Sequence, residues 1–90
     1  MSGADAIELG LIGEAYEDLA GFAGEFVSIR ALREALGGRV PDLDRTLTEM
    51  YQAGEINLTP QENQFALTPA DRGAAVKCGG EEKHRLSWED

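Results

Sequence analysis

The chain has few of the features that would place it in an oxidising compartment or in a membrane. Among its 90 residues there is one cysteine, Cys78, so no disulfide can form within the chain. Its wholly apolar runs extend for two or three residues, whereas a helix that spans a bilayer needs about 20. Residues 1–5 include no basic side chain of the kind that opens a secretory signal. These absences predict a cytoplasmic protein that does not enter a membrane.

Positive charge is also scarce, and it is unevenly distributed. The chain has 8 Lys and Arg residues against 17 Asp and Glu residues, which gives a formal net charge of −9. Residues 1–27 contain six acidic side chains and no Lys or Arg, whereas residues 28–45 contain four arginines and three acids. Nucleic-acid binding draws much of its affinity from neutralised phosphates. This balance therefore disfavours a polyanion as partner, unless the arginines gather on one face.

The remaining composition is typical of one small globular domain. Hydrophobic residues make up 42% of the chain, and its length fits a single domain over residues 1–90. A domain of this size buries only about 60–65% of the surface that its unfolded chain exposes, so most large apolar side chains are needed in the core. We expect that core within residues 5–76, followed by a C-terminal extension over residues 77–90.

Helical periodicity predicts a first helix from about Ala4 to Ala23. Its apolar residues form two neighbouring stripes, which together make an arc of roughly 160°. The first stripe contains Leu9, Ile12, Tyr16, Leu19 and Ala23, and the second contains Leu11, Ala15, Phe22 and Phe26. Because glycine disfavours helix, we expect this helix to break near Gly10 and Gly13 or to end by Gly21.

Two further helices are delimited by capping residues. Ser28 is expected to cap a helix that runs through Leu36 and ends at the Gly37-Gly38 pair. Asp42 is expected to cap the next helix, which Gly54 ends. Both helices place apolar side chains on one face, as a surface helix packed on a core does.

After Gly54 the apolar period changes from 3.6 to 2, which indicates strands. Residues 56–59 and 64–68 alternate around a turn at residues 60–63, and this pattern predicts a two-stranded hairpin. Thr68-Pro69 followed by an acid at Asp71 predicts a short helix to about Val76. A last strand is expected over residues 83–88, with three side chains on one face: His84, Leu86 and Trp88.

Two stretches resemble the winged helix-turn-helix superfamily. The pattern Leu43-x3-Leu47-x2-Met50-x3-Gly54-x-Ile56 is similar to the third helix and first wing strand of that superfamily. Phe65-Ala66-Leu67-Thr68, with Gly73 following, resembles the second wing strand and turn of MarR-type regulators. The resemblance covers roughly residues 5–75. It implies a mainly helical α+β fold, with three helices and a two-stranded wing, to which a short extra helix and a C-terminal strand are added.

In DNA-binding members of that superfamily the third helix enters the major groove. The resemblance therefore implies a candidate nucleic-acid surface made of arginines and of polar side chains on the third helix: Arg30, Arg33, Arg39, Arg45, Thr48 and Gln52. Its surroundings are acidic, because Glu49 lies four residues from Arg45, and Asp42 and Asp44 lie where phosphates would approach. The wing tip contributes Glu62 and no basic side chain.

The apolar arc of the first helix is wider than the roughly 100° that a core-facing stripe needs. The surplus predicts a protein interface, or self-association, through Leu11, Phe22 and Phe26, with Trp88 as an aromatic anchor. The alternative interpretation is that these side chains pack within the core and that Trp88 docks the chain end.

Catalytic and metal chemistry find little support in the sequence. Cys78 and His84 are two of the three or four ligands that a zinc site needs, and no phosphate-binding GxxxxGK[ST] motif occurs. We therefore predict no enzyme activity, no metal, no cofactor and no small-molecule substrate. The leading hypothesis is a non-catalytic winged-helix module with an acidic surface, which binds protein within a larger assembly. The alternative is a sequence-specific, dimeric DNA-binding transcriptional regulator.

Overall fold

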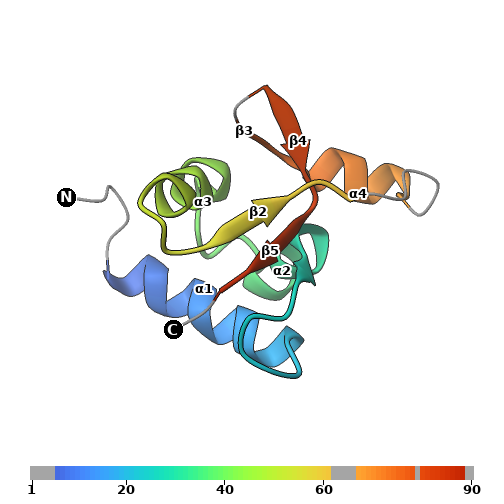
Figure 1. Ribbon diagram of the computed structural model, residues 1–90. Coiled ribbons are helices and arrows are strands. Elements are labelled where there is room, and N and C mark those ends of the chain that lie inside the picture. The colour runs from blue at the N-terminus through green and yellow to red at the C-terminus, as the bar shows by residue number, and fades with distance from the viewer. Residues whose placement is uncertain (1–5, 62–66, 79, 89–90) are drawn as a thin grey trace.

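Four helices and two small antiparallel sheets make up the part of the chain that the structure describes. The computed structural model describes residues 6–61, 67–78 and 80–88. Its elements in chain order are α1 (Ala6–Leu19), β1 (Val27–Ser28), α2 (Ile29–Leu36), α3 (Leu43–Gln52), β2 (Asn57–Thr59), α4 (Pro69–Ala74), β3 (Val76–Cys78), β4 (Glu81–Lys83) and β5 (Arg85–Ser87). Figure 1 shows their arrangement. The α+β class predicted from the sequence is confirmed.

The larger sheet has β5 at its centre, in the order β1-β5-β2, and both of its ladders are antiparallel. Leu86 of β5 pairs with Val27 on one side and with Leu58 on the other, and all three side chains are buried. Side chains that directly oppose each other across strands are the main source of sheet stability. This apolar row therefore joins three segments that are distant in the sequence.

The strand that pairs with β2 differs from the prediction. The second strand predicted over residues 64–68 is wrong at Leu67 and Thr68, which lie in no strand, and the described partner of β2 is β5. Residues 62–66, and with them Glu62 and Phe65, lie outside the described residues. Alternation of apolar side chains reveals which face of a strand is buried, but not which strand lies beside it. The expected C-terminal extension thus supplies the central strand of the sheet.

The second sheet is a hairpin of β3 and β4, which the sequence analysis did not predict. The fourth helix ends at Ala74 rather than near Val76, and Val76 begins β3 and is fully buried. Gly80, at φ 81°, lies in the turn between the two strands. The strand expected over residues 83–88 is divided at His84, whose backbone N–H donates to the Thr59 carbonyl oxygen at 2.9 Å.

The predicted helix caps are confirmed. The Ser28 hydroxyl accepts from the backbone N–H of Ala31, and Gly37, in the left-handed region at φ 58°, ends α2. The Asp42 carboxylate caps α3 in the same way. Thr68 and Asp71 form a capping box at the start of α4. Each cap satisfies backbone N–H groups that have no partner inside the helix.

The first helix is unbroken at Gly10 and Gly13 and ends before Gly21, which is the second of the two predicted outcomes. It runs continuously from Ala6 to Leu19, so its glycines do not interrupt it. Its buried face holds Ile12 and Tyr16, but Leu19 is 39% exposed, so its expected place on the core stripe is wrong. The reason is that the helix ends there, and the chain then turns through residues 20–26 into β1.

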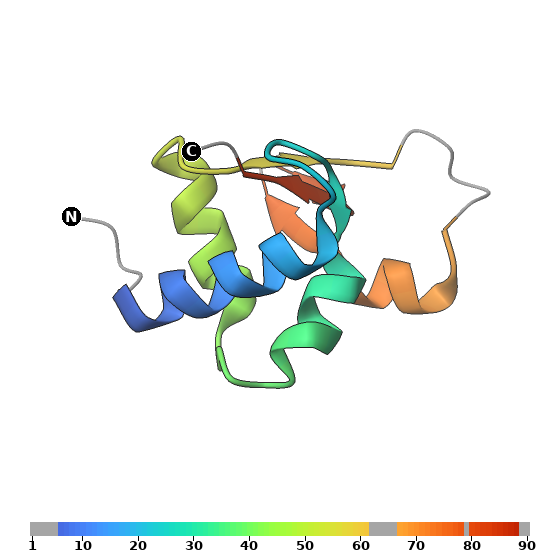
Figure 2. The ribbon, with the colours of Figure 1, turned by 90° about the horizontal axis from the view of Figure 1, so that it is seen from below.

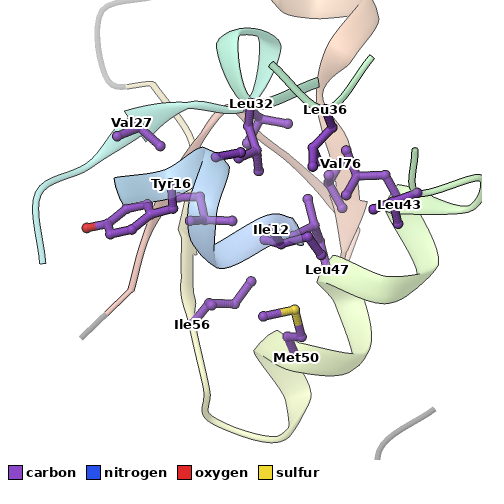
Figure 3. Packing of buried hydrophobic residues seen from close by; sticks show 14 of the residues in the cluster. Ile12, Tyr16, Val27, Leu32, Leu36, Leu43, Leu47, Met50, Ile56 and Val76 are labelled. Carbon is purple, nitrogen blue, oxygen red and sulfur yellow. The ribbon is translucent and has the colours of Figure 1, made fainter. Parts of the chain in front are cut away.

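The core lies between the helices and one face of the larger sheet. Figure 2 shows α1 and α2 on the same side of that sheet. Figure 3 shows side chains from α1, α2 and α3 meeting there, and Ile12, Leu32 and Leu47 have no exposed surface. Val76 of β3 also reaches this cluster, so both sheets contribute to one core. No helix in the described ranges is both long enough and apolar enough to cross a membrane.

Candidate functional site

The arginines of the candidate nucleic-acid surface contact acidic side chains. Arg30 on α2 binds Asp71 of α4 through its Nε atom at 2.7 Å, and its Nη1 atom lies 3.1 Å from Glu34. The backbone N–H of Thr68 and the Arg30 guanidinium together lower the pKa of Asp71 to about 2. Asp71 is therefore charged over the whole neutral range, and Arg30 faces two carboxylates.

The other arginines are also engaged. Arg33 forms an ion pair with Asp44, and its Nε atom donates to the Ala74 carbonyl oxygen at 2.8 Å. Arg45 pairs with Glu49 at 3.1 Å, as its position four residues away predicts.

Arg39 binds backbone instead of a carboxylate. It donates to the carbonyl oxygens of Leu36 and Ala35 at the end of α2, where a cation also complements the helix dipole. Arg39 thus acts as part of the C-terminal cap of α2.

The two polar candidates on α3 differ in how far they are engaged within the fold. The Thr48 hydroxyl donates to the Asp44 carbonyl oxygen of its own helix at 2.7 Å, and Gln52 is exposed in the last turn. Exposed ion pairs such as Arg45–Glu49 are worth about 0–1 kcal/mol, so a phosphate could displace them at little cost. The displaced carboxylates would nevertheless stay beside the phosphate and repel it. The outer face of α3 is therefore poorly suited to hold a polyanion.

The four predicted interface residues fall into two classes. Phe22 is 66% exposed and Phe26 is 42% exposed, although both are large apolar side chains. Leu11 and Trp88 are half-buried and pack against the core cluster. The structure does not place the four residues on one patch, but it does bring Phe22 and Trp88 to the same groove.

That groove, called here the α1 groove, has a volume of about 210 Å³. It lies where the last turns of α1 and the following loop meet the residue after β5, and it is lined by Gly13, Tyr16, Glu17, Ala20, Gly21, Phe22, Ala23 and Trp88. The rings of Tyr16 and Trp88 are 6.4 Å apart between centroids and tilted by 48°.

Two hydrogen bonds fix the walls of the α1 groove. The Tyr16 hydroxyl donates to the Glu25 carbonyl oxygen at 2.7 Å, and the backbone N–H of Gly24 donates to the Trp88 carbonyl oxygen at 3.2 Å. A Cβ atom at Gly13 would lie 3.5 Å from the Trp88 ring, so the indole packs directly on the backbone of α1. These contacts make the groove a preformed feature, which lowers the entropic cost of filling it.

Phe26 does not line the α1 groove, and its ring already contacts a cation of the fold. The Arg85 guanidinium carbon is 5.1 Å from the centroid of the Phe26 ring, a cation–π distance. Of the two exposed phenylalanines, only Phe22 thus lines the groove.

Sequence reasoning missed Tyr16 and Glu17 as lining residues. The predicted core stripe includes Tyr16, and this prediction is confirmed, because Tyr16 is only 4% exposed. Glu17 follows it on the next position of α1, on the side that the periodicity places opposite the apolar arc, so no sequence signal identifies it as a lining residue. Trp88, which is distant in the sequence, packs over Gly13 of α1, and only the fold reveals this contact.

The two residues considered as metal ligands lie in different surroundings. His84 is buried, and its Nδ1 atom accepts from the backbone N–H of Gln61 at 3.1 Å. Cys78 is partly buried at the end of β3. Across the described ranges, no three or more His, Cys, Asp or Glu side chains converge in a geometry that suits a metal ion.

Comparisons with known proteins add no relative to this geometry. No protein-family model, no curated protein and no solved structure matches the chain.

Proposed function

We propose that this protein is a non-catalytic interaction module that binds a protein partner through the α1 groove and the exposed Phe22 beside it. The observation that carries the proposal is a large aromatic side chain, Phe22, which is 66% exposed. It lines a preformed groove together with two other aromatic residues, Tyr16 and Trp88. Aromatic anchors that fill pockets supply much of the energy of protein interfaces. The proposal extends to a place in a larger assembly, where such a module would dock.

The order of elements supports a winged-helix architecture for this module. A helix, a short strand, two helices and then a strand, β2, follow one another, and β2 pairs antiparallel with a later strand, β5. In this proposal β2 and β5 are the two wing strands, and α4 with the β3–β4 hairpin is inserted between them. A fold of this type serves many functions, so the function rests on the surface and not on the fold.

The alternative, a dimeric regulator that reads DNA through α3, is favoured by two features. The Arg45 side chain is 72% exposed, and Arg39 faces no carboxylate in the described part of the chain. Against it stand the acids beside Arg30, Arg33 and Arg45, which oppose the phosphate contacts that dominate affinity for DNA.

Selection from a random peptide display library tests the proposal. Matched variants are Phe22→Ser, which alters the groove rim, and Ile7→Ser, which removes another exposed apolar side chain, near the N-terminal end of α1. We expect enriched peptides to bind the wild-type protein and Ile7→Ser, but not Phe22→Ser.

The DNA alternative is tested in parallel by titrating a labelled random duplex at several salt concentrations. Binding whose log K falls steeply with log salt, and which Arg33→Ala with Arg45→Ala abolishes, would replace the proposal if no Phe22-dependent peptide is found. Sedimentation of the wild-type protein and Phe22→Ser at several concentrations reports whether a second copy uses the same surface.

A further inference from the structure

We propose that the α1 groove receives the side chain of a lysine or arginine, presented by a basic segment of the partner. This inference rests on the proposed interaction function and names the chemistry of the occupant. It combines the size of the groove, its aromatic walls and the charge around it.

The size of the α1 groove suits one side chain. Sites for drug-sized ligands and cofactors have volumes of about 300–1,000 Å³. The groove, at about 210 Å³, falls below this range. A single long side chain fills such a space, and the rest of the segment then lies across the rim, where Phe22 is exposed.

The aromatic walls favour a cation over a neutral chain. The face of an indole ring is the best aromatic partner for an ammonium or guanidinium group. Elsewhere in the described structure this chemistry is already in use, since Arg85 lies over Phe26 and the Lys83 Nζ atom lies 5.7 Å from the centroid of the Tyr51 ring. Within the described residues, no cation lies over Trp88. The Trp88 ring lines the groove and is partly exposed, so a cation from outside can reach it.

The surrounding charge selects the same occupant. Glu17 lines the groove, and Glu14 and Asp18 are exposed on the same helix. None of these three carboxylates forms an ion pair with another described residue, and residues 1–27 contain no Lys or Arg. An ion pair with Glu17 would join the cation–π contact, and the two together hold a guanidinium more tightly than either alone. A second copy of this chain would bring the same acids to the interface, so like charges oppose it.

Trp88 offers a direct measurement, because it is the only tryptophan in the chain. Its emission is followed while a short Gly/Ser peptide, whose only charged side chain is one central arginine, is added to the protein. The matched control peptide carries citrulline, which keeps the shape of arginine without its charge. We expect saturable binding of the arginine peptide, and an affinity for the citrulline peptide that is about tenfold or more lower.

Two matched charge variants locate the contact. Glu17→Gln removes the carboxylate inside the groove and is expected to weaken binding about fivefold or more, whereas Glu14→Gln removes one outside it and is expected to change binding less than about twofold. Phe22→Leu keeps an apolar side chain at the rim but removes the aromatic ring. Weaker peptide binding by this variant would indicate an aromatic contact, and unchanged binding would indicate an apolar one. Circular dichroism checks that each variant is folded.

Each outcome decides between the inference and its alternatives. Equal weakening by Glu17→Gln and Glu14→Gln would mean diffuse electrostatic attraction, and equal binding of the citrulline peptide would mean an apolar site; either result overturns the inference. If display selection yields Phe22-dependent peptides that are neutral or acidic, the proposed function stands and the basic occupant is wrong. If Phe22→Ser instead abolishes self-association and no peptide binds, a second copy fills the groove and the inference is also wrong.

Discussion

The acidic side chains of this protein serve different ends in two regions of its surface. Around α2, α3 and α4, carboxylates face arginines within the fold, as Asp71 faces Arg30. On α1, carboxylates such as Glu17 have no ion-pair partner in the described part of the chain. In the first region the carboxylates pair with arginines of the fold, whereas in the second they are exposed to solvent near the exposed ring of Phe22.

The comparison shows why net charge alone is a poor guide to partners. A formal net charge of −9 is one value for the whole chain, so it does not show which parts of the surface repel nucleic acid. In the described part of the chain, Glu14, Glu17 and Asp18 of α1 form no ion pair, and Glu17 lines the α1 groove. The structure also shows that the arginines, the feature that most favoured DNA, are engaged by neighbouring acids or by backbone.

The largest expected effect tests whether the two regions form one cooperative unit. Leu86→Ala removes a fully buried side chain from β5, which contacts β1 near the α1 region and β2 near α3. We expect a loss of about 2–5 kcal/mol in the free energy of unfolding, measured in urea. The transition should remain single, because both regions depend on the same strand. Two separate transitions would show that the two regions unfold independently of each other.

A smaller effect is expected in the region of paired charges. Thr68→Ala removes the hydroxyl that caps α4 and should reduce stability by about 1 kcal/mol, measured by thermal or urea unfolding. Thr48→Ala is the matched control, because its hydroxyl bonds only within an already formed helix. A change at Thr48 as large as that at Thr68 would show that α4 is not specially dependent on its cap.

The pH dependence of stability should carry the signature of Asp71. Its pKa is lowered from 3.8 to about 2 by the Thr68 backbone N–H and by Arg30, so the folded state binds the proton less readily than the unfolded state. The stability that Asp71 contributes is therefore complete above pH 3.8 and is lost as the pH falls toward 2. We expect the wild-type protein to be more stable than Asp71→Asn at neutral pH, and this difference to shrink over that acidic interval. Unfolding of both proteins in urea across this range measures it, and a difference that does not vary with pH would contradict the ion pair.

The smallest effect concerns the unpaired acids of α1. Asp18→Asn should change stability by less than about 0.5 kcal/mol, because the side chain is exposed and makes no ion pair in the described structure. The expected sign is stabilising at low ionic strength, since neighbouring acids repel one another, and the effect should vanish as salt is added. Loss of stability would mean that this acid has an internal role after all, which would weaken the contrast between the two regions.

Local features of the fold could be predicted from the sequence, and distant ones could not. Ser28, Asp42 and Thr68 cap helices through bonds to residues within three positions, so their neighbours in the sequence suffice to identify them. The partner of β2 depends on whether Leu58 packs against a strand close by or against Leu86, and the alternating pattern is the same in both cases.

The same distinction between local and distant contacts applies to the candidate site. The wide apolar arc of one predicted helix made Phe22 a candidate for the surface, but in the structure Phe22 is exposed in the loop that follows α1. The neutralisation of Arg30 by Asp71 and the packing of Trp88 over Gly13 join segments distant in the sequence, so only the fold reveals them. The pairing of Arg45 with Glu49 lies within one helix and was predicted correctly.

The position of β5 has a consequence for biosynthesis. Residues 85–87 complete the middle of a sheet whose two outer strands are translated earlier, so β1 and β2 lack the central strand of the described sheet until β5 has been translated. Unpaired strand edges of this kind invite association with other chains. The larger sheet therefore closes only after β5 has been translated, and a chaperone that shields β1 and β2 until then would raise the yield of folded protein.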